Sequence, residues 1–142
     1  MKRATFLLDL SREHHTALAL AHRVRKALKI GDGLELLEIG QDVTAGFESE
    51  LLPHFSKEEF ELLPFLLACG EVELVERTRA EHRGLTRMAT EIARAVAAGG
   101  DEGLESHLVN FAEMLVAHVR FEERQLFERA QDLAVDDDRV FS

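Results

Sequence analysis

One short pattern occurs twice in the sequence, and both copies combine histidine with glutamate. Each copy reads His-x-x-x-Glu-Glu, and the copies begin at His54 and His118. Residues four positions apart are neighbours on one face of an α-helix. His54 can therefore meet Glu58, and His118 can meet Glu122, at a single point. The second glutamate of each copy is rotated by a further ~100°, so we predict the first glutamate to be the ligand.

Single histidines complete this pattern on the other two predicted helices. At ~100° per residue, one histidine of each helix lies within about 50° of the mean direction of that helix's apolar face. These four histidines are His14, His54, His82 and His118. His15 and His22 lie far from the apolar face and are expected to face solvent. The sequence thus predicts one inward-pointing histidine from each wall of a bundle.

Histidine and carboxylate together are ligands suited to iron, manganese or zinc. A carboxylate in a core without a cation carries a desolvation cost of several kcal/mol, and here two such carboxylates are predicted. A single histidine on an apolar stripe is more often a hydrogen-bonded core residue. Four histidines and two glutamates, however, are a reasonable set for two ions bridged by carboxylates, as in other bundle sites. The six predicted ligands are His14, His54, Glu58, His82, His118 and Glu122.

The elements that must position these residues are helices. Two prolines and nine glycines, grouped mostly in a few places, leave long helix-forming stretches between them. We predict helices over about 11–29, from 47 to near Pro64 or Cys69, and over about 71–98 and 104–134, with Ser11 as the first N-cap. Residues 34–46, interrupted by Gly40 and Gly46, are expected to be irregular or partly helical. The simplest packing is an all-α, up-down-up-down antiparallel four-helix bundle, forming a single domain over residues 1–142.

Composition narrows the classes of function. The 17 Lys and Arg against 27 Asp and Glu give a formal charge of -10, which repels phosphate backbones and anionic lipid surfaces. We therefore expect no nucleic-acid or membrane partner, and a cytoplasmic protein. The single cysteine, Cys69, excludes a Cys-rich zinc site and is expected to be a small buried residue. Asp136-Asp137-Asp138 should begin an exposed acidic tail.

The order of these motifs resembles the hemerythrin-like, HHE cation-binding domains over nearly the whole chain. The matching stretches are residues 10–15, 54–64, 81–82 and 118–127. The resemblance implies a four-helix bundle that holds a non-haem, oxo- or hydroxo-bridged di-iron centre. It makes the four inward histidines terminal ligands, and Glu58 and Glu122 bridging carboxylates. Hemerythrins proper use a five-residue spacing that would select Glu123, and a shifted register would select His15.

One departure from this family bears on function. Oxygen-carrying hemerythrins have a second histidine four residues away on the third helix, whereas Thr78 and Thr86 flank His82 at that distance here. A coordination position is then left for water or an exogenous ligand. We expect interaction with O2, nitric oxide or peroxide, in sensing, scavenging or iron handling under stress. The alternatives are a di-iron oxidase, an iron-donating repair protein, or an interaction module that metal merely staples together.

Overall fold

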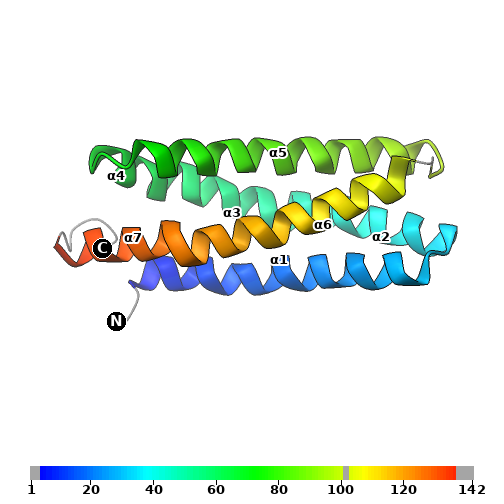
Figure 1. Cartoon of the computed structure of the whole chain (residues 1–142), viewed down its shortest axis with the longest axis horizontal. Helices are drawn as coiled ribbons and strands as arrows, with labels where there is room; N and C mark the ends of the chain where they lie inside the picture. Colours follow the sequence, from blue (N-terminus) through cyan, green and yellow to red (C-terminus); the bar gives the residue numbers. More distant parts are fainter. Residues whose placement is uncertain (1–3, 101–102, 137–142) are drawn as a thin grey trace.

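The computed structural model describes residues 4–100 and 103–136, which form a four-helix bundle running up, down, up and down (Figure 1). The first and third walls are α1 (Thr5–Ile30) and α5 (Val72–Ala97). The second wall consists of α2 (Gly33–Gly46), η1 (Phe47–Leu51), α3 (Leu52–Lys57), η2 (Glu58–Leu62) and α4 (Leu63–Ala68). The fourth wall consists of α6 (Gly103–Phe121), η3 (Glu122–Leu126) and α7 (Phe127–Asp136). The predicted fold class is confirmed.

The second and fourth walls separate the other two. Both α1 and α5 pack against α2 and α6, so α1 and α5 lie diagonally across the bundle. The chain therefore visits neighbouring walls in order, and each wall presents one stripe to a shared interior. This arrangement lets residues from all four walls meet on the bundle axis.

The second wall is longer than predicted, because residues 34–46 are helical throughout rather than irregular or partly helical. Asp32 caps α2, and its side chain accepts a hydrogen bond from the backbone N–H of Leu34 at 3.0 Å. Gly40 is buried, and a Cβ there would lie 2.6 Å from Cγ2 of Val96 on α5. This glycine therefore serves close packing of two helices and does not interrupt the helix.

The first helix also begins earlier than predicted. Its N-cap is Ala4, which gives no side-chain cap, and Ser11 lies inside α1. The helix ends as expected at Gly31, whose φ of 73° lies in the left-handed region that favours glycine. Gly70, with φ 87°, closes the turn between the second and third walls in the same way.

Three wide π-helical turns interrupt the two composite walls. In η2 and η3 the wide turn begins at a glutamate of a His-x-x-x-Glu-Glu pattern: the N–H of Leu63 bonds to the carbonyl of Glu58, and that of Phe127 to the carbonyl of Glu122. Turns η1 and η2 directly precede α3 and α4, each of which has a proline in its first turn. Proline has no N–H and crowds the preceding turn, so a wider turn accommodates it within a continuous wall. Such turns are frequent at functional sites.

The bundle interior contains two apolar clusters with a polar layer between them. One cluster extends from Ala17 on α1 towards the α1–α2 turn and takes in buried side chains of α2, α5 and α6. The other includes Leu7, Leu62 and Phe127 at the opposite end. On each wall the predicted metal ligands lie near the point where members of the first cluster give way to members of the second. The polar layer is therefore enclosed at both ends by close-packed apolar side chains.

Three further expectations can be compared with the structure. Cys69 is exposed at the end of the second wall rather than buried, because the helix stops there and leaves its side chain outside the core. Asp136 ends α7, and the rest of the predicted acidic tail lies outside the described residues. None of the described helices is both long enough and apolar enough to span a bilayer.

Candidate metal centre

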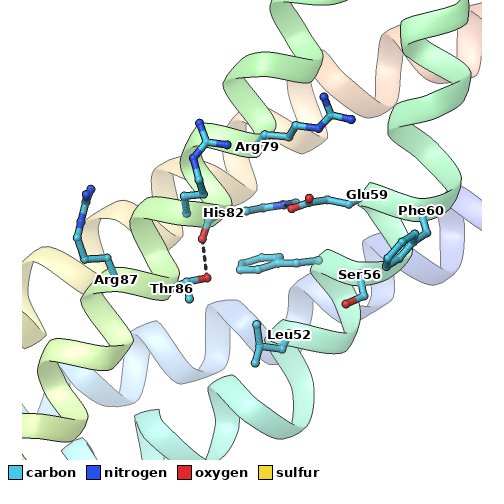
Figure 2. Close-up of a pocket in the computed structure, with 10 residues that line it drawn as sticks. Leu52, Ser56, Glu59, Phe60, Arg79, His82, Thr86 and Arg87 are labelled. Atoms are coloured by element: carbon cyan, nitrogen blue, oxygen red, sulfur yellow. Dashed lines mark hydrogen bonds and ion pairs between the residues drawn. The ribbon is translucent and has the colours of Figure 1, made fainter.

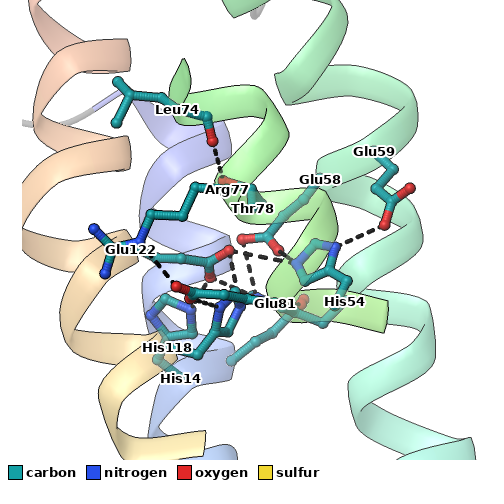
Figure 3. Close-up of polar contacts among 12 residues, drawn as sticks. His14, His54, Glu58, Glu59, Leu74, Arg77, Thr78, Glu81, His118 and Glu122 are labelled. Atoms are coloured by element: carbon teal, nitrogen blue, oxygen red, sulfur yellow. Dashed lines mark hydrogen bonds and ion pairs between the residues drawn. The ribbon is translucent and has the colours of Figure 1, made fainter. Parts of the chain in front are cut away.

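The six residues predicted as ligands meet in the polar layer, and all six are buried. Figure 3 shows imidazoles and carboxylates from all four walls converging on one place. The set is His14 from α1, His54 and Glu58 from the second wall, His82 from α5, and His118 and Glu122 from the fourth wall. His15 and His22 are exposed, as predicted. The sequence pattern therefore identified the inward face of every wall.

Glu122 lies at the centre of the layer, within reach of all four histidines. Its Oε1 lies 2.8 Å from Nε2 of His14 and 3.6 Å from Nε2 of His54. Its Oε2 lies 3.1 Å from Nε2 of His118 and 3.5 Å from Nε2 of His82. One carboxylate can therefore join the two sides of the layer.

Glu58 makes a similar connection from the second wall. Its Oε1 lies 2.9 Å from Nε2 of His82, and its Oε2 lies 3.3 Å from Nε2 of His54. The donors fall into two groups, in each of which the donor atoms lie within 4.8 Å of one another. Both groups contain Glu58 and Glu122; the first adds His14 and His54, and the second adds His82 and His118. Two donor groups that share both carboxylates are compatible with two neighbouring cations.

Some buried polar atoms of the layer lack a hydrogen-bond partner, and their chemistry shows whether the layer could bind a metal ion. Four buried atoms have no hydrogen-bond partner: Nε2 of His54, Oε2 of Glu58, Nε2 of His118 and Oε2 of Glu122. The two pairs at 3.3 and 3.1 Å are close enough but lack hydrogen-bond geometry. Buried polar atoms without partners are costly and rare. Lone pairs of imidazole and carboxylate directed at one another around a common point fit a cation.

The outward nitrogen of every histidine in the layer also has a partner. Each Nδ1 contacts a second carboxylate on a neighbouring wall. These contacts are His54 with Glu13 at 2.8 Å, His82 with Glu59 at 2.7 Å, His118 with Glu81 at 2.7 Å, and His14 with Glu123 at 2.6 Å. A carboxylate that accepts from Nδ1–H fixes the tautomer in which the Nε2 lone pair is free for metal.

Sequence reasoning missed these four orienting carboxylates. It placed Glu59 and Glu123 away from the inward donors, where the structure also has them, but it did not give them a role. The signal is that each one directly neighbours a predicted ligand in the chain, as Glu13 neighbours His14 and Glu81 neighbours His82. A ~100° rotation points such a residue at the adjacent wall. The contacts therefore run around the bundle, each wall orienting the histidine of the next.

The carboxylates raise the basicity of the layer. Burial alone would lower the pKa of His54, but the nearby carboxylates of Glu122 and Glu58 outweigh it and raise that pKa to about 11. The same opposition raises the pKa of His118 to about 10. Burial likewise favours a high pKa for Glu122, but the surrounding histidines, His118 first, hold it well below the usual value. In the metal-free layer the carboxylates therefore favour protonated histidines.

The two threonines that flank His82, at the distance where a further histidine was sought, both use their hydroxyl groups in hydrogen bonds to backbone carbonyls of α5. Thr78 is buried, and its hydroxyl donates to the carbonyl of Leu74 at 2.8 Å. Thr86 is exposed and donates to the carbonyl of His82 itself at 2.8 Å. The second donor group therefore has two histidines, like the first.

The alternative ligands lie elsewhere. His15 is exposed, and Glu123 contacts the outward nitrogen of His14. The arrangement therefore favours His14 and Glu122 as the inward pair.

Comparison with known proteins agrees with this description. The family model described as the hemerythrin HHE cation binding domain matches residues 5–130. Neither a curated protein nor a solved structure gives a significant match. The matched range contains all six inward donors and all four orienting carboxylates.

Proposed function

The chain belongs to the hemerythrin HHE cation-binding domain family, and on this premise we propose that it is a non-haem di-iron protein that interacts with O2, nitric oxide or peroxide. The proposed ligands are His14, His54, Glu58, His82, His118 and Glu122. Its role would be sensing, scavenging or iron handling under oxidative or nitrosative stress. Manganese or zinc could occupy the same donors, since the ligand types admit all three metals.

The observation that carries this proposal is the pair of overlapping donor groups. Each group has two histidines and shares both carboxylates. Two histidines with carboxylate and further open positions are typical of non-haem iron sites that react with small ligands. The equal number of histidines in the two groups supports a small exogenous ligand at either ion.

The chain's own residues prepare this site in three ways. The inward Nε2 atoms and the two buried glutamates hold the ions, and the orienting carboxylates keep each imidazole in one tautomer. The apolar clusters on both sides, including Phe127 stacked on His14 with ring centroids 5.2 Å apart, limit the access of water. Bound iron would supply redox chemistry with a diatomic ligand or peroxide.

The test is anaerobic reconstitution of the metal-free protein with excess Fe(II), followed by desalting and an iron count. We expect about two ions per chain, because the donors form two groups. A count near zero would contradict the proposal and leave the buried histidines as structural residues. The His22→Ala variant is the matched control, since His22 is exposed and its loss should leave the count unchanged.

Reactivity decides between the proposed role and its alternatives. The loaded protein is mixed with O2, nitric oxide or peroxide, and its visible absorption is recorded. A spectral change without turnover supports sensing or scavenging. Steady turnover with a reductant would instead indicate an oxidase, and loss of iron to an acceptor would indicate a donor. Bound iron that raises thermal stability but reacts with none of these would indicate a metal-stapled module.

A further inference from the structure

A groove of about 590 Å³ lies beside the polar layer, between α5 and the α3–η2 stretch of the second wall (Figure 2). Phe55 and His82 are among the residues that line it, and their rings stack with centroids 4.0 Å apart at 14°. The inward nitrogen of His82 faces Glu58 and Glu122. A molecule in the groove would therefore be separated from the proposed di-iron centre by the imidazole ring of His82.

Three arginines line this groove on successive turns of α5. They are Arg79, Arg83 and Arg87, and none of them forms an ion pair with any residue in the described part of the chain. Two other arginines of the same helix, Arg77 and Arg94, each pair with a glutamate. In a chain with a formal charge of -10, three unpaired arginines in a row are available to an external anion.

The groove also exposes the least constrained of the four orienting carboxylates. The side chain of Glu59 is 39% exposed and, among the described residues, its one hydrogen-bond partner is His82. The other three have a second partner: Glu13 binds Lys57, Glu81 binds Arg77, and Glu123 binds Ser11. The bundle wall is therefore closed by polar contacts at three corners and is open at the groove.

Apolar side chains complete the lining. Phe60 is 81% exposed, and Leu52 is also exposed, although both are large and hydrophobic. Both line the groove together with Phe55. An exposed apolar surface rimmed by charged groups is typical of a ligand site.

We propose that this groove binds a small organic anion with an apolar body, such as an aliphatic monocarboxylate. The arginines would bind the carboxylate, and Leu52 and Phe60 would contact the apolar body. The groove has the volume of typical small-molecule sites, about 300–1,000 Å³. Because this recognition uses no metal ligand as a donor, it stands independently of the proposed di-iron centre.

The test is calorimetric titration of the full chain, as purified and after metal removal, with three probes. Octanoate carries both features, 1-octanol lacks the charge, and inorganic phosphate lacks the apolar body. We expect octanoate to bind in both forms of the protein, and the other two at least about tenfold more weakly, the loss of one charge-assisted contact. No octanoate binding up to 10 mM, on the order of the weakest useful affinity, would overturn the proposal, as would equal binding of 1-octanol.

Variants locate the binding. Arg83→Gln combined with Arg87→Gln should weaken octanoate binding at least about tenfold. Arg25→Gln is the matched control, because Arg25 is exposed on α1 and has no ion pair within the described residues. An equal effect of the control would overturn the assignment to the groove.

A second variant probes the apolar side. Phe60→Ser should weaken octanoate binding and leave phosphate binding unchanged, and since Phe60 is exposed the bundle should fold normally. If octanoate binding is unchanged, the proposed contact is wrong. The iron count of all these variants should equal that of the unmodified chain, so a failure of the groove proposal is distinguishable from a failure of the metal centre.

Discussion

The two donor groups of the polar layer contain the same kinds of ligand but lie behind different walls. In the group with His14 and His54, the orienting carboxylates are Glu123 and Glu13. Their side chains are 31% and 32% exposed, and each has a second polar partner. In the group with His82 and His118, one backing carboxylate, Glu81, is only 16% exposed, whereas Glu59 is 39% exposed and opens on the groove. The donor sets are equivalent, and the access to them is not.

This difference lies in the outer carboxylates, which contact the outward nitrogens of the histidines, and not in the inner donors. The repeated His-x-x-x-Glu-Glu pattern fixes the inner donors, because helical spacing alone brings each pair together. The outer carboxylates depend on what each neighbouring wall offers, such as Lys57 beside Glu13 or Arg77 beside Glu81. The two donor groups therefore differ in their orienting carboxylates and not in their inward donors.

Removing a shared carboxylate should break both halves at once and give the largest effect. Glu122 contacts all four histidines, so Glu122→Ala should reduce bound iron from about two ions per chain to well below one. Glu123→Ala is the matched control, and it should lose less iron because Glu123 contacts the outward nitrogen of His14 rather than the inward nitrogens. A greater loss from Glu123→Ala, measured by iron count after desalting, would reverse the ligand assignment.

Removing one histidine should separate the halves. His54→Ala affects the first group and His118→Ala the second, so each should lose at least one ion per chain. Both histidines also lie near the shared carboxylates, which makes some loss from the opposite half the expected result. Unchanged iron in both variants would defeat the site assignment.

Neutralising an orienting carboxylate should give a smaller effect that differs between corners. Loss of such a partner typically weakens metal binding about 10–100-fold. Glu81→Gln should lie at the upper end, because Glu81 is the more buried carboxylate and is held by Arg77. Glu59→Gln should lie at the lower end. Affinities from competition with a coloured chelator measure this ranking, and equal values would show that the open wall makes no difference.

The pH dependence of the metal-free protein should give the smallest effect. Burial lowers the pKa of His82, but Glu122 and Glu58 outweigh burial and raise that pKa to about 9. The pKa of His54 is raised to about 11 for the same reason. Because these folded-state values lie above the unfolded value of about 6.5, their contribution to stability is complete below about pH 6.5 and is lost as pH rises through about 9 to 11.

The measurement is the Tm at pH 7 and pH 10, with and without metal. The metal-free protein should lose several degrees, on the order of what 1–2 kcal/mol produces in a domain of this size. The loaded protein should change less, because metal replaces the proton on Nε2. A Tm that rises with pH in the metal-free form would contradict the assigned directions.

Much of the fold followed from local rules. Glycines at Gly31 and Gly70 ended the helices where they were expected to, and the apolar stripes gave the inward direction of each wall. The prediction was wrong over 34–46, because Gly40 serves a close contact with Val96 on another helix. Such a contact leaves no trace in the local sequence. Ser11 was wrongly predicted as a cap, because α1 already begins at Thr5 and the Ser11 hydroxyl instead donates to Glu123 on the fourth wall at 3.2 Å.

The sequence by itself determined which side chains point inward, because that depends only on helical period and on which face is apolar. It therefore identified four histidines and two glutamates that the structure brings together. Tertiary structure alone decided which carboxylate orients which histidine, which arginines remain unpaired, and where the wall opens. Those properties depend on the packing of neighbouring walls, since a hydrogen bond between helices exists only once the helices are placed side by side.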